Sequence, residues 1–360
     1  MKTKIYFSDK VSSLASLNRL LKTESFKDSE FFLLVDENTY ANCMPHFISY
    51  VDILDNVRFF EVPIGEEAKS LEVASQLWSE LLESGADRNS VIINLGGGAV
   101  CDLGGFVAAG FKRGIRYINV PTTLIGMVDA ALGGKTAVNL ESAKNQIGFF
   151  YPPTSVVVDP VFLDTLEDDE CLSGCFEIVK TLLLSDAEML KSLESILSPE
   201  MQLDIDCLRP YIRHCVDFKQ AVTQADPYER SLRKILNLGH TLGHGIESYA
   251  IEQGSPIPHG YAVALGLAGE LYLSVNKLGL DKQIYLDYCK MIGNFISFPK
   301  LKLKETEAIM KYIRQDKKNR DGLILCTLLK DVGVPMIDVV VDENEVRDAL
   351  MKIVFGTNKR

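Results

Sequence analysis

Three of the five histidines in the chain fall close together, at positions 240, 244 and 259, which is a pattern typical of a metal site. His240 and His244 are four residues apart, so on a helix their imidazoles lie on one face. His259 can complete a set of three ligands that leaves a coordination position open for substrate. A lone helical histidine is more often a hydrogen-bonded core residue. Gly239 and Gly243 favour a ligand site instead, because each weakens a helix by about 1 kcal/mol and indicates a close backbone approach.

A glycine-rich turn after a predicted buried strand is a candidate phosphate cradle. The strand ends at Leu95 and the turn covers Gly96–Asp102. Glycines let the backbone approach a pyrophosphate, and the following helix offers free N–H groups at its N-terminus. Asp36, at the end of an earlier strand, can accept hydrogen bonds from a ribose, and Thr122-Thr123 close another strand at the same edge. The sequence therefore predicts a dinucleotide ligand, although Cys101 stands at the third glycine position of the Rossmann pattern.

Lysines beside glycines indicate that the other ligand is an anion. They occur in Gly133–Lys135 and Lys144–Gly148, where neither packing nor helix propensity explains them. Glu177 and Lys180 share a helix face inside a mainly apolar segment. Because an unpaired buried carboxylate is costly, Glu177 is expected to face a cation or the metal.

The elements that must position these residues divide the chain into two parts. Apolar runs alternate with helical patterns such as Glu66–Glu83 in the first part, and the runs are Phe31–Val35, Phe59–Val62, Val91–Leu95, Tyr117–Val120 and Ser155–Val158. This alternation predicts an α/β domain with a parallel sheet over residues 1–160. Longer amphipathic stretches predict a mainly helical domain over 161–360, and they are Asp169–Leu184, Leu208–Gln224, Arg230–Tyr249 and Tyr261–Leu278. Short strands are expected again at Leu323–Leu328 and Met336–Val340.

Charge and cysteine usage exclude several kinds of partner. The formal net charge is −11, so no general positive field attracts nucleic acid or an anionic membrane. No run of about 18 apolar residues could span a bilayer. The eight cysteines are scattered, without a Cys-x-x-Cys pair, which predicts a reduced, cytoplasmic protein.

Dispersed motifs in a fixed order give the chain a family resemblance. They are Gly96–Phe106, Arg113–Ile115, Val120–Thr123, Asp129–Lys135, Lys144–Gly148, Glu177–Lys180, Leu232–His244, His259-Gly260 and Asp316–Lys318. The chain resembles the 3-dehydroquinate synthases, a family of sugar phosphate cyclases, over essentially its whole length. The resemblance implies an NAD-dependent lyase with Zn²⁺, or Co²⁺ in its place, that acts as a homodimer. Its reaction converts 3-deoxy-D-arabino-heptulosonate 7-phosphate into 3-dehydroquinate and phosphate, with NAD regenerated in each turnover.

The resemblance also implies roles for single residues. The implied metal ligands are Glu177, His240 and His259, whereas spacing alone pairs His240 with His244. The residues implied to position substrate hydroxyls are Asp129, Lys180, Asn237 and His244. The residues implied to bind the phosphate are Lys135, Asn145, Lys317 and the partner subunit's Arg113, and those implied to bind the carboxylate are Lys219 and Arg233. The NAD positions are Asp36, Asn38, Glu66, Lys69, Gly97, Gly98, Asp102, Thr122, Thr123, Lys144, Phe162 and Thr165.

Other classes of protein fit part of the pattern. A metal-dependent polyol dehydrogenase shares the glycine turn but has no use for Lys135, Lys144 and Arg233 together. A non-catalytic nucleotide-binding protein would not need Glu177 beside the histidines. Another sugar phosphate cyclase is the nearest alternative. Arg233 favours the dehydroquinate reaction over it, because a guanidinium fork fits a substrate carboxylate that a plain hexose phosphate lacks.

Overall fold

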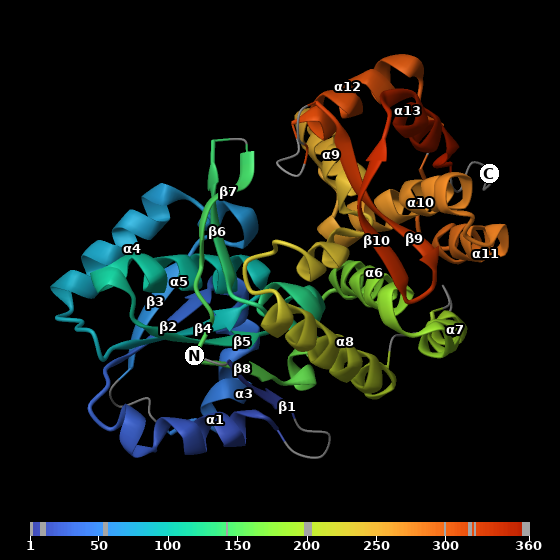
Figure 1. Cartoon of the computed structure of the whole chain (residues 1–360). Helices are drawn as coiled ribbons and strands as arrows, with labels where there is room; N and C mark the ends of the chain where they lie inside the picture. The colour runs from blue at the N-terminus through green and yellow to red at the C-terminus, as the bar shows by residue number, and fades with distance from the viewer. Residues whose placement is uncertain are drawn as a thin grey trace. The chain divides into compact units, whose positions relative to one another are not determined.

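The computed structural model of the chain describes residues 3–7, 12–52, 57–141, 143–197, 204–298, 300–315, 319 and 322–354. The chain forms two compact units, one within Met1–Cys171 and Leu208–Pro227, the other within Leu172–Cys207 and Tyr228–Arg360. The predicted division at residue 160 differs from these units in where it assigns 161–171 and 208–227. Figure 1 shows the helices and strands of both units, with labels on most of them.

A six-stranded parallel sheet forms the centre of the first unit (Figure 1). Its strands are β1 (Lys4–Phe7), β2 (Phe31–Asp36), β3 (Val57–Val62), β4 (Val91–Gly96), β5 (Arg116–Pro121) and β8 (Ser155–Val158), in the order β1-β8-β5-β4-β2-β3. Every residue of β2, β4 and β8 is buried, as expected when helices cover a parallel sheet. The five predicted strands are confirmed. The edge strand β1 was not predicted, because it is short and only partly buried.

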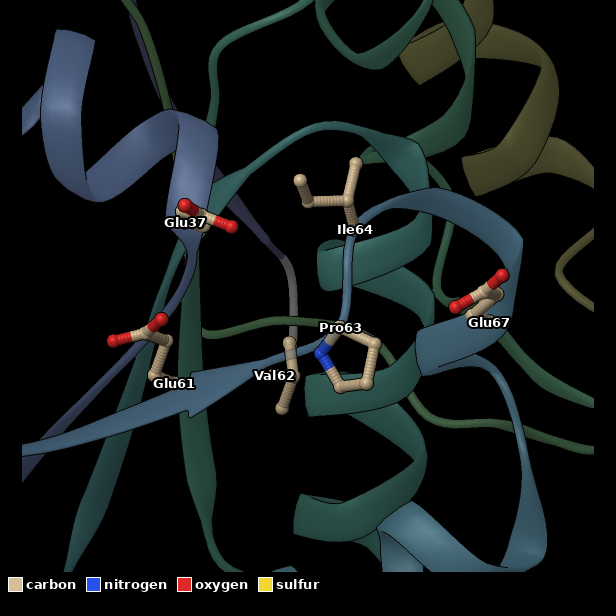
Figure 2. A pocket seen from close by; sticks show the side chains of 6 residues that line it. All are labelled: Glu37, Glu61, Val62, Pro63, Ile64 and Glu67. Atoms are coloured by element: carbon tan, nitrogen blue, oxygen red, sulfur yellow. The ribbon is translucent and has the colours of Figure 1, made fainter.

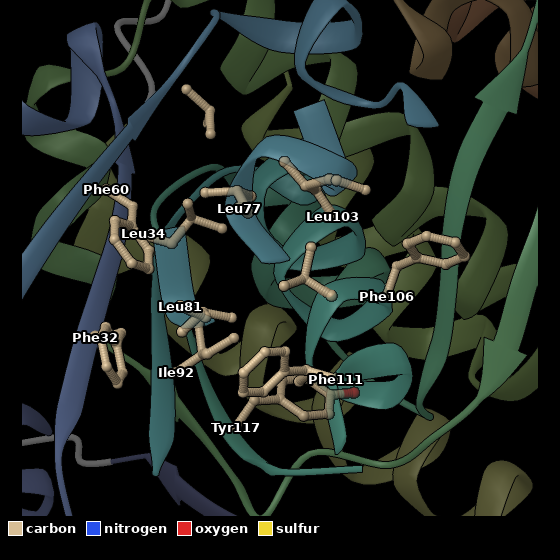
Figure 3. Close-up of a cluster of buried hydrophobic side chains, with 14 of the residues drawn as sticks. Phe32, Leu34, Phe60, Leu77, Leu81, Ile92, Leu103, Phe106, Phe111 and Tyr117 are labelled. Carbon is tan, nitrogen blue, oxygen red and sulfur yellow. The ribbon is translucent and has the colours of Figure 1, made fainter. Parts of the chain in front are cut away.

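Helices and a hairpin complete the first unit. The helices are α1 (Leu14–Leu21), α2 (Glu37–Asn42), α3 (Met44–Ile48), α4 (Leu71–Glu83), α5 (Gly98–Gly110) and most of α8 (Ile205–Ala225). Helix α5 is apolar on nearly all sides and packs Leu103 and Phe106 into a core with Ile92 and Tyr117 (Figure 3). The antiparallel hairpin of β6 (Lys135–Leu140) and β7 (Ala143–Phe150) contacts α5.

The second unit is mainly helical, as predicted. Its helices are most of α6 (Asp168–Ser185), and α7 (Ala187–Ile196), α9 (His240–Glu252), α10 (His259–Leu278), α11 (Lys282–Ile292), α12 (Leu303–Arg314) and α13 (Glu343–Lys352). The two predicted strands form a hairpin of β9 (Ile324–Asp331) and β10 (Val334–Val341). No helix among the described residues is long and apolar enough to cross a membrane.

One predicted helix is wrong in its extent. The pattern over Arg230–Tyr249 suggested a continuous helix, but a 3₁₀ helix at Leu232–Asn237 and α9 are separate. The break falls at Gly239, whose φ of 79° lies in the left-handed region that favours glycine. Apolar periodicity continues through such a break and therefore cannot reveal it.

The glycines beside the histidines serve the contact between α9 and α10. A Cβ on Gly266 would lie 1.9 Å from the carbonyl oxygen of Gly239, and one on Gly243 would lie 2.9 Å from that of Ala262. The sequence predicts a close backbone approach to a ligand at Gly239 and Gly243. In the structure, the partner that they approach is a neighbouring helix.

We predict that Gly104→Ala destabilises the first unit through a single contact. A Cβ on Gly104 of α5 would lie 1.8 Å from Oδ1 of Asn94, which is fully buried in β4. Overpacking of this kind costs about 1–3 kcal/mol in the free energy of unfolding. Denaturant unfolding followed by the fluorescence of Trp78, the one tryptophan of the chain, reports on this unit.

The control is the same substitution in an Asn94→Ala background, where the obstructing side chain is absent. There we expect Gly104→Ala to cost almost nothing, because alanine is the better helix former. An equal cost in both backgrounds would contradict the packing explanation.

Candidate active site

His240, His244 and His259 come together in the second unit, as their spacing predicts. Each has a ring nitrogen within 4.8 Å of a ring nitrogen of the other two. His240 begins α9, His244 follows one turn later, and His259 begins α10. His240 is buried, His259 is half-buried and His244 is exposed, so the cluster is open to a ligand on the His244 side.

Glu177 of α6 brings a carboxylate to two of these histidines. Its Oε1 lies 3.7 Å from His240 Nε2 and 3.6 Å from His259 Nε2, distances too long for hydrogen bonds. Glu177 is 1% exposed, and its Oε1 has no hydrogen-bond partner among the described residues. A buried carboxylate oxygen left in this way is costly. One carboxylate with two imidazoles is a ligand set of catalytic zinc sites, so these donors fit a divalent metal.

Lys180, one helical turn further along α6, is the cation that Glu177 was expected to face. Its Nζ lies 2.5 Å from Glu177 Oε2, and both side chains are 1% exposed. Burial raises the pKa of Glu177, but the Lys180 ammonium and the two histidines outweigh burial and hold this pKa well below its usual range. The carboxylate is therefore ionised, which is the form that binds metal.

Hydrogen bonds at Nδ1 orient the imidazoles of His240 and His259. His240 Nδ1 lies 3.0 Å from the carbonyl oxygen of Leu238, and His259 Nδ1 lies 3.1 Å from Oε2 of Glu247. Such partners fix Nδ1 as the donor and leave the lone pair of Nε2 for a metal. Glu247 was not predicted as a site residue. It lies two helical turns after His240 on α9, and that spacing is the signal that could have identified it.

The same groups set the charge of the histidines. Burial lowers the pKa of His240 well below its usual value, and the nearby Lys180 lowers it further. Burial also lowers the pKa of His259, but the carboxylates of Glu177 and Glu247 outweigh burial and raise this pKa to about 10. The carboxylates that stabilise a proton on His259 would stabilise a metal cation beside it for the same electrostatic reason.

Other predicted substrate residues of this unit lie before α9. Arg233, in the 3₁₀ helix, is 2% exposed. Asn237 ends the same helix, and its Nδ2 donates to Glu229 Oε1 at 2.8 Å. Lys317, a predicted phosphate ligand, lies outside the described residues.

The candidate dinucleotide site lies in the first unit, where β2, β4 and β5 end at one edge of the sheet. Asp36 ends β2, Gly96 ends β4 and Thr122 follows β5. Helix α5 begins here with Gly97 as its N-cap, a residue that has no side chain to cap the helix. Its first N–H groups therefore suit a pyrophosphate. A Cβ on Gly97 would lie 3.0 Å from Cγ2 of Thr123, so the turn is also closely packed.

A cavity of about 510 Å³ lies beside the ends of β2 and β3 (Figure 2). Its lining residues are Glu37, Glu61, Val62, Pro63, Ile64 and Glu67. Glu37 stands between the predicted NAD residues Asp36 and Asn38, and Glu67 follows Glu66. None of the lining residues was predicted as a site residue.

Asp36, a predicted NAD residue, caps α2, because its Oδ1 accepts from the Thr39 N–H at 2.8 Å.

Lys69 joins predicted NAD and substrate residues. It is 4% exposed, and its Nζ donates to Asp102 Oδ2 at 2.8 Å and to Asn145 Oδ1 at 2.6 Å. Asp102 belongs to α5, whereas Asn145 belongs to the β6–β7 hairpin and has a left-handed φ of 55°. The buried ammonium therefore fixes the hairpin to the helix that follows the glycine turn.

Asp129 and Lys219 also form a pair. Lys219 Nζ lies 2.7 Å from Asp129 Oδ1 and donates to the Asp129 carbonyl oxygen at 2.7 Å. Asp129 lies in a π-helical turn at Gly126–Ala130, a conformation frequent at functional sites. Asn119 Nδ2 supports this turn by donating to the Ala131 carbonyl oxygen at 3.0 Å. Asn119 was not predicted, although an asparagine inside an apolar strand is a recognisable signal.

The remaining predicted residues are dispersed over the first unit. Lys135 is exposed at the start of β6, and Lys144 is half-buried in β7. Phe162 is buried and Thr165 exposed in the 3₁₀ helix Pro160–Thr165. Arg113 is exposed and, within the described part of the chain, makes no hydrogen bond or ion pair with another predicted substrate residue. Its assigned role stays a prediction.

Solved structures share the fold. A 2-deoxy-scyllo-inosose synthase complexed with carbaglucose-6-phosphate, NAD⁺ and Co²⁺ is 25% identical, with a TM-score of 0.82 over 97% of this chain and 96% of its own. The 2-epi-5-epi-valiolone synthase of Streptomyces hygroscopicus, with NAD⁺ and Zn²⁺ bound, is 24% identical, with a TM-score of 0.80 over 98% and 97%. A probable glycerol dehydrogenase from Sinorhizobium meliloti is 14% identical, with a TM-score of 0.60 over 98% and 95%. The fold is that of the sugar phosphate cyclases.

Sequence comparison identifies the family within this class. Residues 59–173 match the 3-dehydroquinate synthase N-terminal family, and residues 174–319 match the 3-dehydroquinate synthase C-terminal family. The 3-dehydroquinate synthase of Parabacteroides distasonis is 38% identical over 331 residues, 91% of this chain and 92% of that protein. That of Clostridium tetani is 37% identical over 347 residues, 96% and 91%. The chain belongs to the 3-dehydroquinate synthase family.

We predict that Lys69→Met lowers the free energy of unfolding of the first unit by about 1–3 kcal/mol, because it leaves Asp102 and Asn145 without their shared donor. Unfolding followed by Trp78 fluorescence measures the change. Lys27→Met is the control, since Lys27 is 67% exposed and only 3.7 Å from Glu24 in an exposed pair that contributes about 0–1 kcal/mol. A loss at Lys69 no larger than the loss at Lys27 would show that the bridge is unimportant.

Proposed function

We infer that the chain is a 3-dehydroquinate synthase that converts 3-deoxy-D-arabino-heptulosonate 7-phosphate into 3-dehydroquinate and phosphate. One observation carries the inference: in a chain of this family, Glu177 Oε1 lies 3.6–3.7 Å from the Nε2 atoms of His240 and His259. The reaction makes the protein a carbon–oxygen lyase, because phosphate is eliminated and its C–O bond breaks.

A metal and a dinucleotide supply the chemistry that side chains cannot. Zn²⁺ or Co²⁺ held by Glu177, His240 and His259 would act as a Lewis acid on a substrate hydroxyl, and NAD would accept a hydride and return it. The two cyclase structures that share the fold support this proposal, since they were solved with NAD⁺ and with Co²⁺ or Zn²⁺. The oriented Nδ1 atoms of both histidines support it independently.

The chain's own side chains bind and orient the substrate. His244, which is exposed beside the buried Glu177 and His240, would contact a substrate hydroxyl. Asn237 would contact another, and its hydrogen bond to Glu229 holds it in place. Arg233 offers a planar guanidinium for the carboxylate. Lys135 and Asn145 would bind the phosphate. The aldol closure that ends the reaction depends mainly on such orientation.

The assembly and compartment are also proposals. We propose a homodimer in which the partner subunit's Arg113 reaches the phosphate, and this is supported by the exposure of Arg113 in one copy. We propose that the enzyme works in the cytoplasm, which is supported by the eight cysteines, all of them free thiols. Analytical ultracentrifugation tests the first idea, and a monomer with full activity would contradict it.

We predict that removal of metal by a chelator abolishes turnover and that Zn²⁺ or Co²⁺ restores it. NAD should be needed only in catalytic amount, because the hydride leaves and returns within one turnover. Phosphate release measures turnover, and absorbance at about 340 nm measures NADH. Full activity in metal-free protein would contradict the metal assignment. NADH produced in proportion to product would instead indicate a polyol dehydrogenase.

We predict that Arg233→Lys is strongly impaired although it keeps the positive charge, because lysine cannot bind a carboxylate with two parallel hydrogen bonds. Binding of the heptulosonate phosphate and of an analogue without its carboxylate is measured in wild type and in Arg233→Ala. The analogue should lose little on Arg233→Ala, since the interaction is already absent. Equal losses for both compounds would show that Arg233 does not recognise the carboxylate.

A further inference from the structure

Glu270 is a fully buried carboxylate in the middle of α10, 0% exposed. Its Oε2 accepts a hydrogen bond from the N–H of Gly239 at 2.6 Å, and its Oε1 accepts from those of Thr241 at 3.0 Å and Leu242 at 3.2 Å. These donors belong to the first turn of α9, where a helix leaves its N–H groups without partners inside the helix. Glu270 therefore caps α9 from the neighbouring helix.

Helix α9 has no room for a cap from its own N-cap residue. A Cβ on Gly239 would lie 2.6 Å from Cγ of Leu267 and 3.1 Å from the carbonyl oxygen of Val263, both on α10. Serine, aspartate and asparagine, the usual capping residues, are therefore excluded at this position. The carboxylate from α10 replaces them, and its negative charge interacts favourably with the helix dipole.

The capped segment contains His240. Glu270 binds the N–H groups on both sides of this residue, and the bond from Nδ1 to the Leu238 carbonyl oxygen holds the ring. Together they keep His240 Nε2 3.7 Å from Glu177 Oε1. We propose that Glu270 is a positioning residue of the metal site, which fixes His240 for metal binding without touching the metal. This role of Glu270 rests on one part of the proposed function, namely that Glu177, His240 and His259 bind a metal.

Metal affinity separates this role from a merely structural one. A carboxylate that only held α9 against α10 would change the stability of the fold and leave the affinity of the folded protein for Zn²⁺ unchanged. A residue that preorganises a ligand changes that affinity, typically by about 10- to 100-fold.

The test is Glu270→Gln in the full chain. The amide keeps one acceptor oxygen, but its NH₂ group faces at least one backbone N–H donor, so the cap is broken in part and loses its negative charge with little change of shape. Competition with a chromogenic chelator measures the dissociation constant for Zn²⁺, and we expect it to rise by about 10- to 100-fold. NAD affinity should be unchanged, because the predicted NAD residues belong to the other compact unit. At saturating Zn²⁺, kcat should return close to the wild-type value, because Glu177, His240 and His259 are all intact.

Asp186→Asn is the matched control. Asp186 caps α7 in the same unit, where its Oδ1 accepts from the N–H groups of Glu188 at 3.0 Å and Met189 at 2.9 Å. This variant makes the same change from carboxylate to amide at a helix N-terminus that carries no predicted ligand. It should keep wild-type zinc affinity and lose little stability, because the amide oxygen of asparagine can accept both hydrogen bonds and asparagine caps a helix about as well as aspartate.

The outcomes are distinguishable. A wild type that binds no Zn²⁺ overturns the proposed function itself. Wild-type zinc affinity in Glu270→Gln, or an equal loss in Asp186→Asn, overturns only the role of Glu270. If Glu270→Gln yields no folded protein, Glu270→Asp replaces it, since aspartate keeps the charge but is one methylene too short to reach all three donors. Unchanged zinc affinity in Glu270→Asp then overturns the proposal.

Discussion

The second unit depends on a carboxylate that is both buried and ionised. Glu177 sits in an apolar helix, where an ion without partners costs several kcal/mol. Lys180 balances one oxygen, whereas the other faces two imidazoles. These groups come from α6, α9 and α10, so the three helices must meet at one point before the charge is tolerated. The same requirement creates a place for a divalent cation.

The contact between α9 and α10 keeps His240 and His259 in place beside Glu177. Gly243 and Gly266 remove the side chains that would keep the two backbones apart. Glu247 from α9 orients His259 on α10, while Glu270 from α10 caps the helix that carries His240. Each helix therefore supports the histidine of the other. Such reciprocal support preorganises ligands that a flexible loop could not hold.

Features set by local sequence were predictable from the chain alone. The five apolar strands, the glycine turn at Gly96 and the histidine cluster follow from composition and spacing, and the structure contains all of them. Features that depend on which helices pack together were not predictable. Glu247 and Glu270 look like ordinary charged helix residues until their partners are known. The family resemblance implies an NAD role for Lys69, but it does not reveal the bonds of Lys69 to Asp102 and Asn145. The glycines of α9 carried a real signal of close approach, but sequence could not tell a ligand from a neighbouring helix.

The most direct measurement of the central claim is anomalous X-ray diffraction at the zinc absorption edge from crystals of the zinc-loaded protein. We predict one peak bound by a Glu177 oxygen and by Nε2 of His240 and of His259, each at about 2.0–2.2 Å. A peak bound by His240, His244 and His259, with Glu177 still paired only with Lys180, would contradict the assignment of Glu177 as a ligand. The absence of a peak at the histidine cluster would contradict the site as a whole.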